Sequence, residues 1–142
     1  MQGTFGAHEA QRLRRLHVLM VDSDPGAVEK MERALGEGFI LLCATSVKEA
    51  KQYLQDYSLD IMICEVRLGQ ESGLDLCRHA RSIPSFQHLP IMLLTSHATL
   101  PDKVAGFNAG ADDYVVKPYD ARQIMARIRL LVRLKRLQYP QE

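Results

Sequence analysis

Polar side chains with different chemistry stand directly after four short apolar runs in this sequence. Asp22 follows the first run, Glu65 follows another, and Thr95 and Lys117 stand at the ends of two more. Carboxylates bind hard cations, whereas a lysine and a hydroxyl can hold anionic oxygens. Any one of these residues alone is ordinary solvated loop chemistry. All four together, each at the end of an apolar run, indicate one site for charged groups.

Two kinds of segment alternate along the chain and have to position these side chains. Five short apolar runs are typical of buried parallel strands, and they lie at 17–21, 39–44, 60–66, 90–95 and 112–116. Five longer segments have helical periodicity with capping residues, and they lie at 25–35, 47–56, 73–81, 101–109 and 121–138. Residues 67–72 are predicted to be a polar loop.

This alternation predicts an α/β domain. Strands that alternate with helices form right-handed crossovers, so the sheet should be parallel, with helices on both faces. In such sheets, ligands collect at the carboxyl ends of the strands, near the point where the strand order reverses. The polar residues above stand at those ends, so the sequence predicts that they share one edge of the sheet.

Composition limits the class of protein. The 142 residues are 46% hydrophobic and 25% charged, with a net charge of +1, which favours neither nucleic acid nor an acidic membrane as a partner. Three cysteines without a CxxC pair are expected to be buried, reduced thiols. The N-terminus lacks the apolar core of a signal peptide, and no run is long enough to span a bilayer. We therefore expect a cytoplasmic protein without membrane insertion.

The expected organisation is one domain with two short flanks. Residues 1–15 have no clear apolar period and are predicted to form a loose, mildly basic leader. Residues 16–134 hold all five strand–helix pairs and form the domain. Residues 135–142 extend the last helix and end in a short tail.

Two stretches, one around Glu65 and one around Lys117, carry a family resemblance. Residues 110–119 read Gly-Ala-Asp-Asp-Tyr-Val-Val-Lys-Pro-Tyr, and residues 60–68 read Asp-Ile-Met-Ile-Cys-Glu-Val-Arg-Leu. In order and spacing, residues 16–134 resemble the receiver domain of two-component response regulators. The resemblance implies a flavodoxin-like (βα)5 fold, with a parallel sheet of strand order 2-1-3-4-5. It also implies a cis peptide bond between Lys117 and Pro118.

The resemblance implies a role for each polar residue at this edge of the sheet, where Asp22, Ser23 and Asp24 form an acidic pocket. In the family, two adjacent acids after the first strand help to bind Mg²⁺, and an Asp after the third strand accepts a phosphoryl group. Here Asp22 holds the first acidic position, Ser23 holds the second, and Glu65 holds the acceptor position. Thr95 and Lys117, at positions that bind phosphoryl oxygens in the family, are retained.

Both departures weaken the expected chemistry. Mg²⁺ prefers anionic oxygens, so Ser23 removes one charged ligand. The candidate ligands that remain, for a weak site or none, are Asp22, Glu65 and the Arg67 backbone. Glu65 carries its carboxylate about 1.5 Å farther out than an Asp, and a misplacement of about 1 Å can slow a reaction about 10²-fold. Asp24 could replace the lost ligand, with capping of the next helix as its alternative role. We expect almost no phosphoryl transfer and no cofactor.

The longer side chain could have a use of its own. Glu65 carries a fixed negative charge toward the place of a phosphoryl group, where it could pair with Lys117 and reach the Thr95 hydroxyl. In the family, movement of that hydroxyl shifts the residue at the Tyr114 position and reshapes the face made by the fourth helix, fifth strand and fifth helix. Our hypothesis is that Glu65 favours an active-like state without phosphate. The alternative is a structural ion pair in an inert scaffold.

The last helix and its neighbours suggest an interface. Lys103, Asp112, Asp113 and Arg127 match positions that pair across the dimer face in receivers of winged-helix transcription factors, so a homodimer is expected. Gln123 stands where those receivers usually have Glu, so one cross-dimer pair would be missing. The helix 121–138 has six basic residues and no acid. No helix-turn-helix pattern accompanies it, so we do not expect this domain itself to bind nucleic acid.

The leading interpretation is a signalling domain of a phosphorelay-type pathway that acts without phosphorylation, through protein contacts of the segments 101–109, 112–116 and 121–138. One alternative is a working receiver that accepts a phosphoryl group with Mg²⁺. Another is a regulatory N-terminal module of a longer effector protein. An enzyme on this scaffold is not expected, because the sequence has no Walker loop, dinucleotide fingerprint or catalytic triad order.

Overall fold

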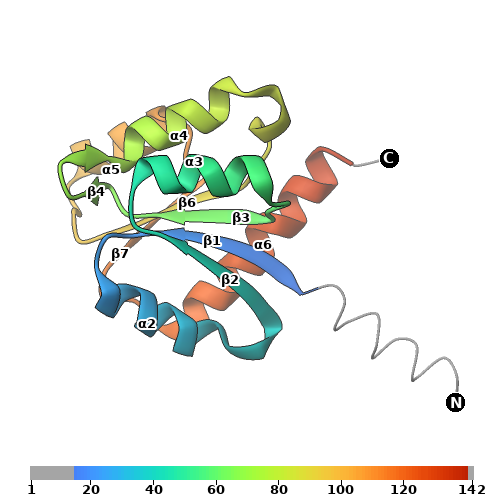
Figure 1. The fold of residues 1–142 in the computed structure, drawn as a ribbon, viewed down its shortest axis with the longest axis horizontal. Coiled ribbons are helices and arrows are strands. Elements are labelled where there is room, and N and C mark those ends of the chain that lie inside the picture. Colours follow the sequence, from blue (N-terminus) through green and yellow to red (C-terminus); the bar gives the residue numbers. More distant parts are fainter. Residues whose placement is uncertain (1–14, 141–142) are drawn as a thin grey trace, which may run out of the picture.

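A five-stranded parallel sheet forms the centre of the computed structural model, which describes residues 15–140 (Figure 1). The strands are β1 (Leu16–Val21), β2 (Phe39–Ala44), β3 (Ile61–Cys64), β6 (Ile91–Thr95) and β7 (Asp113–Val116). They lie in the order β2-β1-β3-β6-β7. This is the predicted 2-1-3-4-5 order, so the flavodoxin-like (βα)5 fold is confirmed. Residues 1–14, nearly all of the predicted leader, and 141–142 lie outside the described residues.

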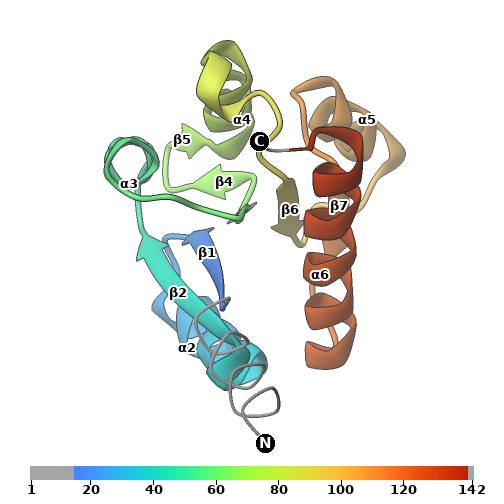
Figure 2. The ribbon, with the colours of Figure 1, turned by 90° about the vertical axis from the view of Figure 1, so that its right-hand side faces the viewer.

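Helices cover both faces of the sheet (Figure 2). The first face carries α3 (Val47–Asp56), α4 (Gly73–Ser82) and α5 (Leu100–Asn108), and the second carries α2 (Pro25–Leu35) and α6 (Ala121–Gln138). Strand β1 shows why two cores form: its side chains alternate between the faces, Leu19 and Val21 toward the first, Val18 and Met20 toward the second. Within residues 15–140, no helix is both long and apolar enough to cross a bilayer.

The helices begin where side-chain caps predict. Asp24 caps α2, Ser46 caps α3, Thr99 caps α5 and Asp120 caps α6, in each case through a side-chain oxygen that accepts a backbone N–H of the first turn. Each cap satisfies an N–H that has no partner within its helix. The predicted cis bond between Lys117 and Pro118 is present just before α6.

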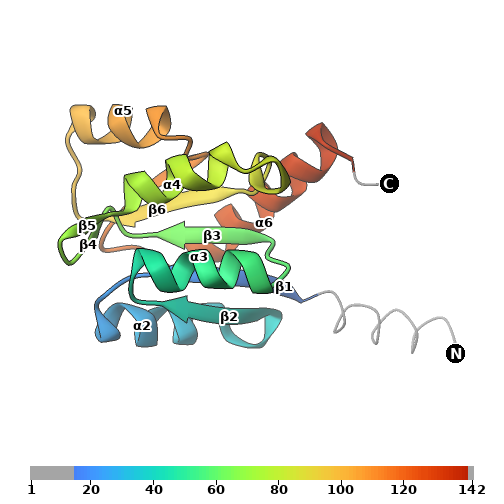
Figure 3. The same cartoon turned by 45° about the horizontal axis from the view of Figure 1, so that its top comes forward.

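The structure differs from the prediction at residues 67–72. This segment is not an irregular loop but a short antiparallel hairpin, with strands β4 (Arg67–Leu68) and β5 (Glu71–Ser72) (Figure 3). Gly69 makes the turn with a φ of 62°, and the side chain of Leu68 is buried in the first core. Two-residue strands are too short to show an alternating pattern, so periodicity alone could not find them.

Gly73 lets α4 begin directly against the end of β3. A Cβ at Gly73 would overlap the carbonyl oxygen of Glu65 and lie 2.9 Å from the Sγ of Cys64. The Gly73 N–H donates to the carbonyl of Val66 at 2.7 Å. The backbone of Glu65 is therefore held in place by the start of the next helix.

Arg81 of α4 ties three segments together. Its guanidinium bonds to the carbonyl oxygens of Phe86, Gln87, Leu89 and Gly110 and to the carboxylate of Asp112. The side chain is mostly buried. Because one cation satisfies carbonyls of the connection after α4 and of the turn before β7, these two irregular segments are held as one unit.

Thiol chemistry offers a test of this packing. Burial raises the pKa of Cys64 well above its ordinary value and that of Cys77 to about 11, whereas Cys43 is only half-buried. Since the thiolate is the reactive form, we expect a disulfide reagent at about pH 8 to modify Cys43 first. Cys64 and Cys77 should react only after denaturation. Rapid reaction of all three thiols in the folded protein would contradict the structure.

Candidate functional site

Lys117 lies between the two predicted acids at the carboxyl edge of the sheet. Its Nζ is 2.9 Å from Oδ2 of Asp22 and 3.3 Å from Oε1 of Glu65. The three residues follow β1, β3 and β7, whose ends meet at one edge because the strands are parallel. Only 4% of the Asp22 side chain and 13% of the Glu65 side chain are exposed. The sequence predicted the Glu65–Lys117 pair, whereas the shorter pair with Asp22 was not anticipated.

All four carboxylate oxygens of these two acids accept a hydrogen bond. Asp22 accepts from the Asp24 N–H at 2.9 Å through Oδ1 and from Lys117 through Oδ2. Glu65 accepts from Lys117 through Oε1 and from the Val66 N–H at 2.6 Å through Oε2. The Glu65 side chain therefore turns back toward its own backbone instead of extending across the pocket.

The same contacts fix the charge of Lys117. Burial by itself lowers the pKa of this lysine, but the hydrogen bonds and negative charges of Asp22 and Glu65 outweigh it and raise the pKa above its ordinary value. The ammonium stays charged at physiological pH. With both acids ionised, two negative charges and one positive charge leave a net charge of −1 on the three side chains.

Ser23 and Asp24 are both exposed, and Asp24 bonds to Asp22 through its backbone N–H and not through its carboxylate. The Asp24 carboxylate accepts from the Gly26 N–H at 3.0 Å at the start of α2, so it has the capping role that was its alternative. Arg67, whose backbone was a candidate metal ligand, begins the β4–β5 hairpin and pairs with Ser72. Neither Ser23 nor Asp24 therefore adds a carboxylate to the buried acids Asp22 and Glu65.

Thr95 and Tyr114 meet at the loop between β6 and α5. Thr95 is fully buried, and its hydroxyl accepts from the His97 N–H at 3.2 Å. The Tyr114 hydroxyl donates to the His97 carbonyl at 2.7 Å, and burial raises its pKa. Among residues 15–140, no hydrogen bond joins Glu65 to the Thr95 hydroxyl, so this structure realises only the first of the two contacts that Glu65 could make, the pair with Lys117. The reason is the bond of Glu65 to the Val66 N–H.

Three of the four residues predicted on a dimer face have partners inside the domain. Arg127 lies 3.0 Å from Asp113, and Lys135 lies 3.0 Å from Asp112. Asp112 also binds the guanidinium of the α4 arginine. Lys103 lies on α5 and is partly exposed. Pairing across a dimer would have to compete with the internal bonds, and the homodimer stays a prediction.

Sequence reasoning did not assign two residues that shape this region. His97 acts through its backbone N–H and carbonyl, so its side-chain type carried no signal. Gly106 of α5 lies against the Tyr114 ring. A glycine inside a predicted helix is a weak signal of close packing, because alanine is the better helix former there.

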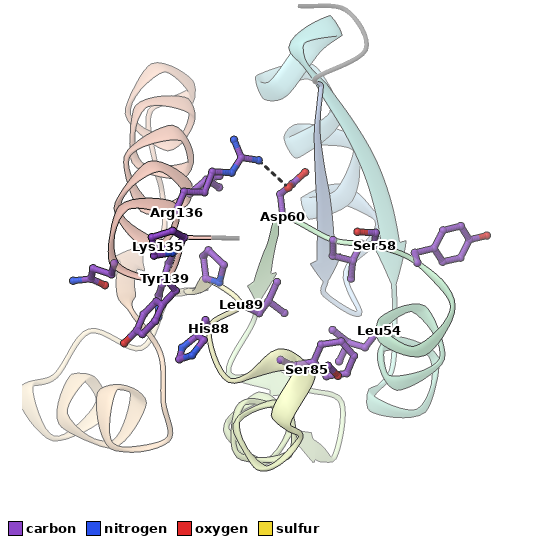
Figure 4. A pocket seen from close by; sticks show the side chains of 16 residues that line it. Leu54, Ser58, Asp60, Ser85, His88, Leu89, Lys135, Arg136 and Tyr139 are labelled. Atoms are coloured by element: carbon purple, nitrogen blue, oxygen red, sulfur yellow. Dashed lines mark hydrogen bonds and ion pairs between the residues drawn. The ribbon is translucent and has the colours of Figure 1, made fainter. Parts of the chain in front are cut away.

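A separate groove lies at the opposite edge of the sheet (Figure 4). Its volume is about 690 Å³, and it is lined by residues before β3 and β6 and by the end of α6. Arg136 is 3.2 Å from Asp60 at one side, and the ring of His88 stacks on Tyr139 with centroids 3.5 Å apart. Both cations of the lining, Lys135 and Arg136, already have carboxylate partners. The groove is thus distinct from the acid–lysine site.

A parallel (βα)5 fold with two acids, a lysine and a buried threonine at one edge defines a receiver-type signalling domain. The family model described as response regulator receiver domain matches residues 18–129. The chain belongs to the response regulator receiver domain family.

Individual relatives agree with this family. Response regulator MprA of Mycobacterium ulcerans is 33% identical over 87% of this chain and 53% of its own length. Heme response regulator HssR of Staphylococcus saprophyticus is 33% identical over 81% of this chain and 50% of its own. This chain therefore spans about half the length of the curated relatives that it matches.

Solved structures show the same fold. A protein from Chloroflexus aurantiacus J-10-fl, assigned as a response regulator, aligns with a TM-score of 0.80 and 34% identity over 84% of this chain and 99% of its own. A CheY-like receiver domain protein from Methanospirillum hungatei JF-1 aligns with a TM-score of 0.79 over 87% of this chain and 98% of its own. At 22% identity, the second likeness supports the fold alone.

Proposed function

We propose that this chain is a receiver-domain signalling module that works without being phosphorylated, through contacts with protein partners. The observation that carries the proposal is the bonding of Asp22 and Glu65. Lys117 bridges the two acids, and backbone N–H groups take their remaining oxygens. The charges that would serve Mg²⁺ and a phosphoryl group in the family already satisfy one another.

Mg²⁺ meets a poor set of donors in this pocket. The ion requires near-octahedral oxygen ligation at about 2.0–2.1 Å, and each carboxylate oxygen of Asp22 and Glu65 would first have to give up a hydrogen bond. Ser23, at the second acidic position, is exposed and uncharged. We infer that the domain binds Mg²⁺ weakly or not at all, and that it uses no other cofactor.

Glu65 is also poorly placed as a nucleophile. In-line transfer needs the reacting atoms aligned and about 3–3.5 Å apart. One carboxylate oxygen is held by Lys117 and the other by the Val66 N–H, which turns the side chain away from an extended approach. Lys117, the group that would receive the phosphoryl oxygens, is occupied by two carboxylates.

The α5–β7–α6 face is the proposed output surface. Leu100, Val104 and Phe107 recur at spacings of four and three along α5, and their side chains are 73%, 48% and 48% exposed. β7 is an edge strand, and α6 brings Arg127 to its side. An exposed apolar patch with charged neighbours is typical of a protein-binding surface. We propose that this surface binds a signalling protein. A second copy of this chain is one such partner.

Phosphorylation is tested directly by intact-mass spectrometry after incubation with acetyl phosphate and Mg²⁺. We expect no added phosphoryl group on the wild type. The Ser23→Asp/Glu65→Asp variant restores both missing groups and should gain one phosphoryl group on part of the protein. Ser23→Asp/Glu65→Gln is the matched control, because it has the second acid but no acceptor carboxylate.

The two outcomes have different meanings. A stable phosphoryl group on the wild type, mapped to the acid–lysine edge, would replace the proposal with the working Mg²⁺-dependent receiver. Absence on the wild type with recovery in the double variant would mean that only the acceptor chemistry has been lost from a competent scaffold.

A second candidate is a regulatory module at the N-terminus of a longer effector protein. The observation that favours it is the length of the relatives, of which this chain spans about half. α6 also continues to Gln138 with Leu134 and Leu137 exposed, as a helix that leads to further structure would. The mass of the native protein purified from its source distinguishes the two forms.

A further inference from the structure

Tyr114 is held inward by contacts from two segments. Its hydroxyl donates to the His97 carbonyl at 2.7 Å, in the loop between β6 and α5. Its ring lies against Gly106 of α5, and only 8% of the residue is exposed although β7 is an edge strand. The side chain therefore joins β7 both to α5 and to the loop that precedes it.

The backbone does not explain why residue 106 is glycine. The residues with positive φ, among those described, are Gly36, Gly69 and Gly110. Gly106 lies inside α5 instead, where it has a helical backbone conformation that any residue type can adopt. Alanine stabilises the interior of a helix relative to glycine, so the reason for glycine must lie in the surrounding space.

That space is filled by two side chains. A Cβ at Gly106 would lie 2.9 Å from Cδ2 and from Cε2 of Tyr114, and 2.8 Å from Cδ1 of Leu93. Leu93 is fully buried in β6, so its side chain has no open solvent into which it could turn. Because a packed core does not absorb an extra methyl group freely, the Tyr114 ring or α5 itself would have to move.

We propose that Gly106 is a positioning residue that keeps Tyr114 inward and thereby sets how α5 presents its outer surface. The Tyr114 ring lies 6.3 Å, centroid to centroid, from Phe107, the half-exposed neighbour of Gly106. The hydrogen bond and ring contacts of Tyr114 involve neither Glu65 nor Lys117. The inward position therefore needs no phosphoryl group. Its effect on a partner rests on the proposed function, whereas the steric coupling does not.

A double-mutant cycle tests the coupling. Gly106→Ala, Tyr114→Val and the double variant are compared with the wild type by urea denaturation. We expect Gly106→Ala to lower the folding equilibrium constant roughly 5- to 150-fold, as overpacking does. With the ring removed by Tyr114→Val, only the contact with Leu93 remains and Leu93 gains space into which it can turn, so Gly106→Ala should then cost clearly less than in the wild type. Gly26→Ala, with ordinary contacts for its Cβ, is the control and should not destabilise.

Hydrogen exchange of backbone amides shows which segment is loosened by the extra methyl group. Gly106→Ala should speed exchange of the amides of residues 96–99, because an expelled ring releases the His97 carbonyl. Tyr114→Phe, which removes only the hydroxyl, should speed exchange in the same loop without removing the cost of Gly106→Ala.

Several results would overturn the proposal. One is stabilisation of the wild-type background by Gly106→Ala, and another is an equal cost with and without the Tyr114 ring. If Gly106→Ala does not fold, the double variant decides: folding of the double variant supports the coupling, and failure to fold where Tyr114→Val alone folds rejects it. None of these outcomes depends on phosphorylation, so they stand apart from the test of the proposed function.

Discussion

Replacing Lys117 with methionine is expected to destabilise the domain by about 2–4 kcal/mol near neutral pH, since removal of one partner from a buried ion pair leaves uncompensated charge. Lys117 is the cation within bonding distance of both Asp22 and Glu65, whose side chains are nearly buried. This expectation is about 1 kcal/mol lower than the usual cost of breaking a buried pair, because 24% of the lysine side chain is exposed. Urea denaturation of both proteins measures the difference.

The stability difference between the wild type and Lys117→Met should depend on pH in a definite direction. Because the folded-state pKa of Lys117 is raised, its stabilising effect is complete below the unfolded pKa of about 10.4 and is lost as pH rises through the folded value. The gap between wild type and Lys117→Met should thus shrink above about pH 10. Arg122→Met is the control, because Arg122 forms an ion pair with Asp120 at the surface, where both side chains are more than half exposed. An equally small loss of unfolding free energy in both variants would show that the bonds of Lys117 to Asp22 and Glu65 contribute little to stability.

Replacing Arg81 with methionine is expected to cost about 3 kcal/mol, because buried carbonyl groups lose their donor. Methionine keeps the apolar stem of the side chain and removes only the guanidinium, which bonds to four carbonyls and to Asp112. Hydrogen exchange should also rise in the connection between α4 and β6 and near Gly110. The two regions should loosen together, since one cation joins them.

Arg78→Met is the matched control for Arg81→Met, one helical turn earlier. Arg78 pairs with Asp75 on the same helix, and both side chains are more than half exposed. Exposed pairs contribute about 0–1 kcal/mol, so this variant should be nearly as stable as the wild type. If the two variants lost the same stability, the guanidinium bonds of Arg81 would not be the cause of its effect.

The fold was predictable because its signals are local and repeated. The central strands β1, β3 and β6 are apolar runs whose residues are mostly buried on both faces. The caps at Asp24, Ser46 and Asp120 mark helix starts whatever the tertiary context. The β4–β5 hairpin escaped because its strands are two residues long. Strand order was not read from periodicity; it came from the family resemblance of residues 16–134.

The site was predictable in position but not in bonding. Parallel strands bring Asp22, Glu65 and Lys117 to one edge, so their proximity follows from topology. Which oxygen meets which donor depends on side-chain torsions, and the bond of Glu65 to the Val66 N–H has no sequence signal. The Arg81 network escaped for a related reason. Its acceptors are mostly backbone carbonyls, which every residue type carries.

The second core closes only when the last helix packs on it. α2 and α6 share that face, and one buried cluster joins Met31 of α2 and side chains of β1, β3 and β6 to Ile124, Ile128 and Val132 of α6. During synthesis at about 5–20 residues per second, the 18 residues of α6 take roughly one to four seconds to appear. Until then, side chains of the sheet that are buried in the finished fold, such as Ile63 and Met92, stay exposed to water. A nascent chain stalled before residue 121 should therefore bind chaperones, whereas one released after α6 should not.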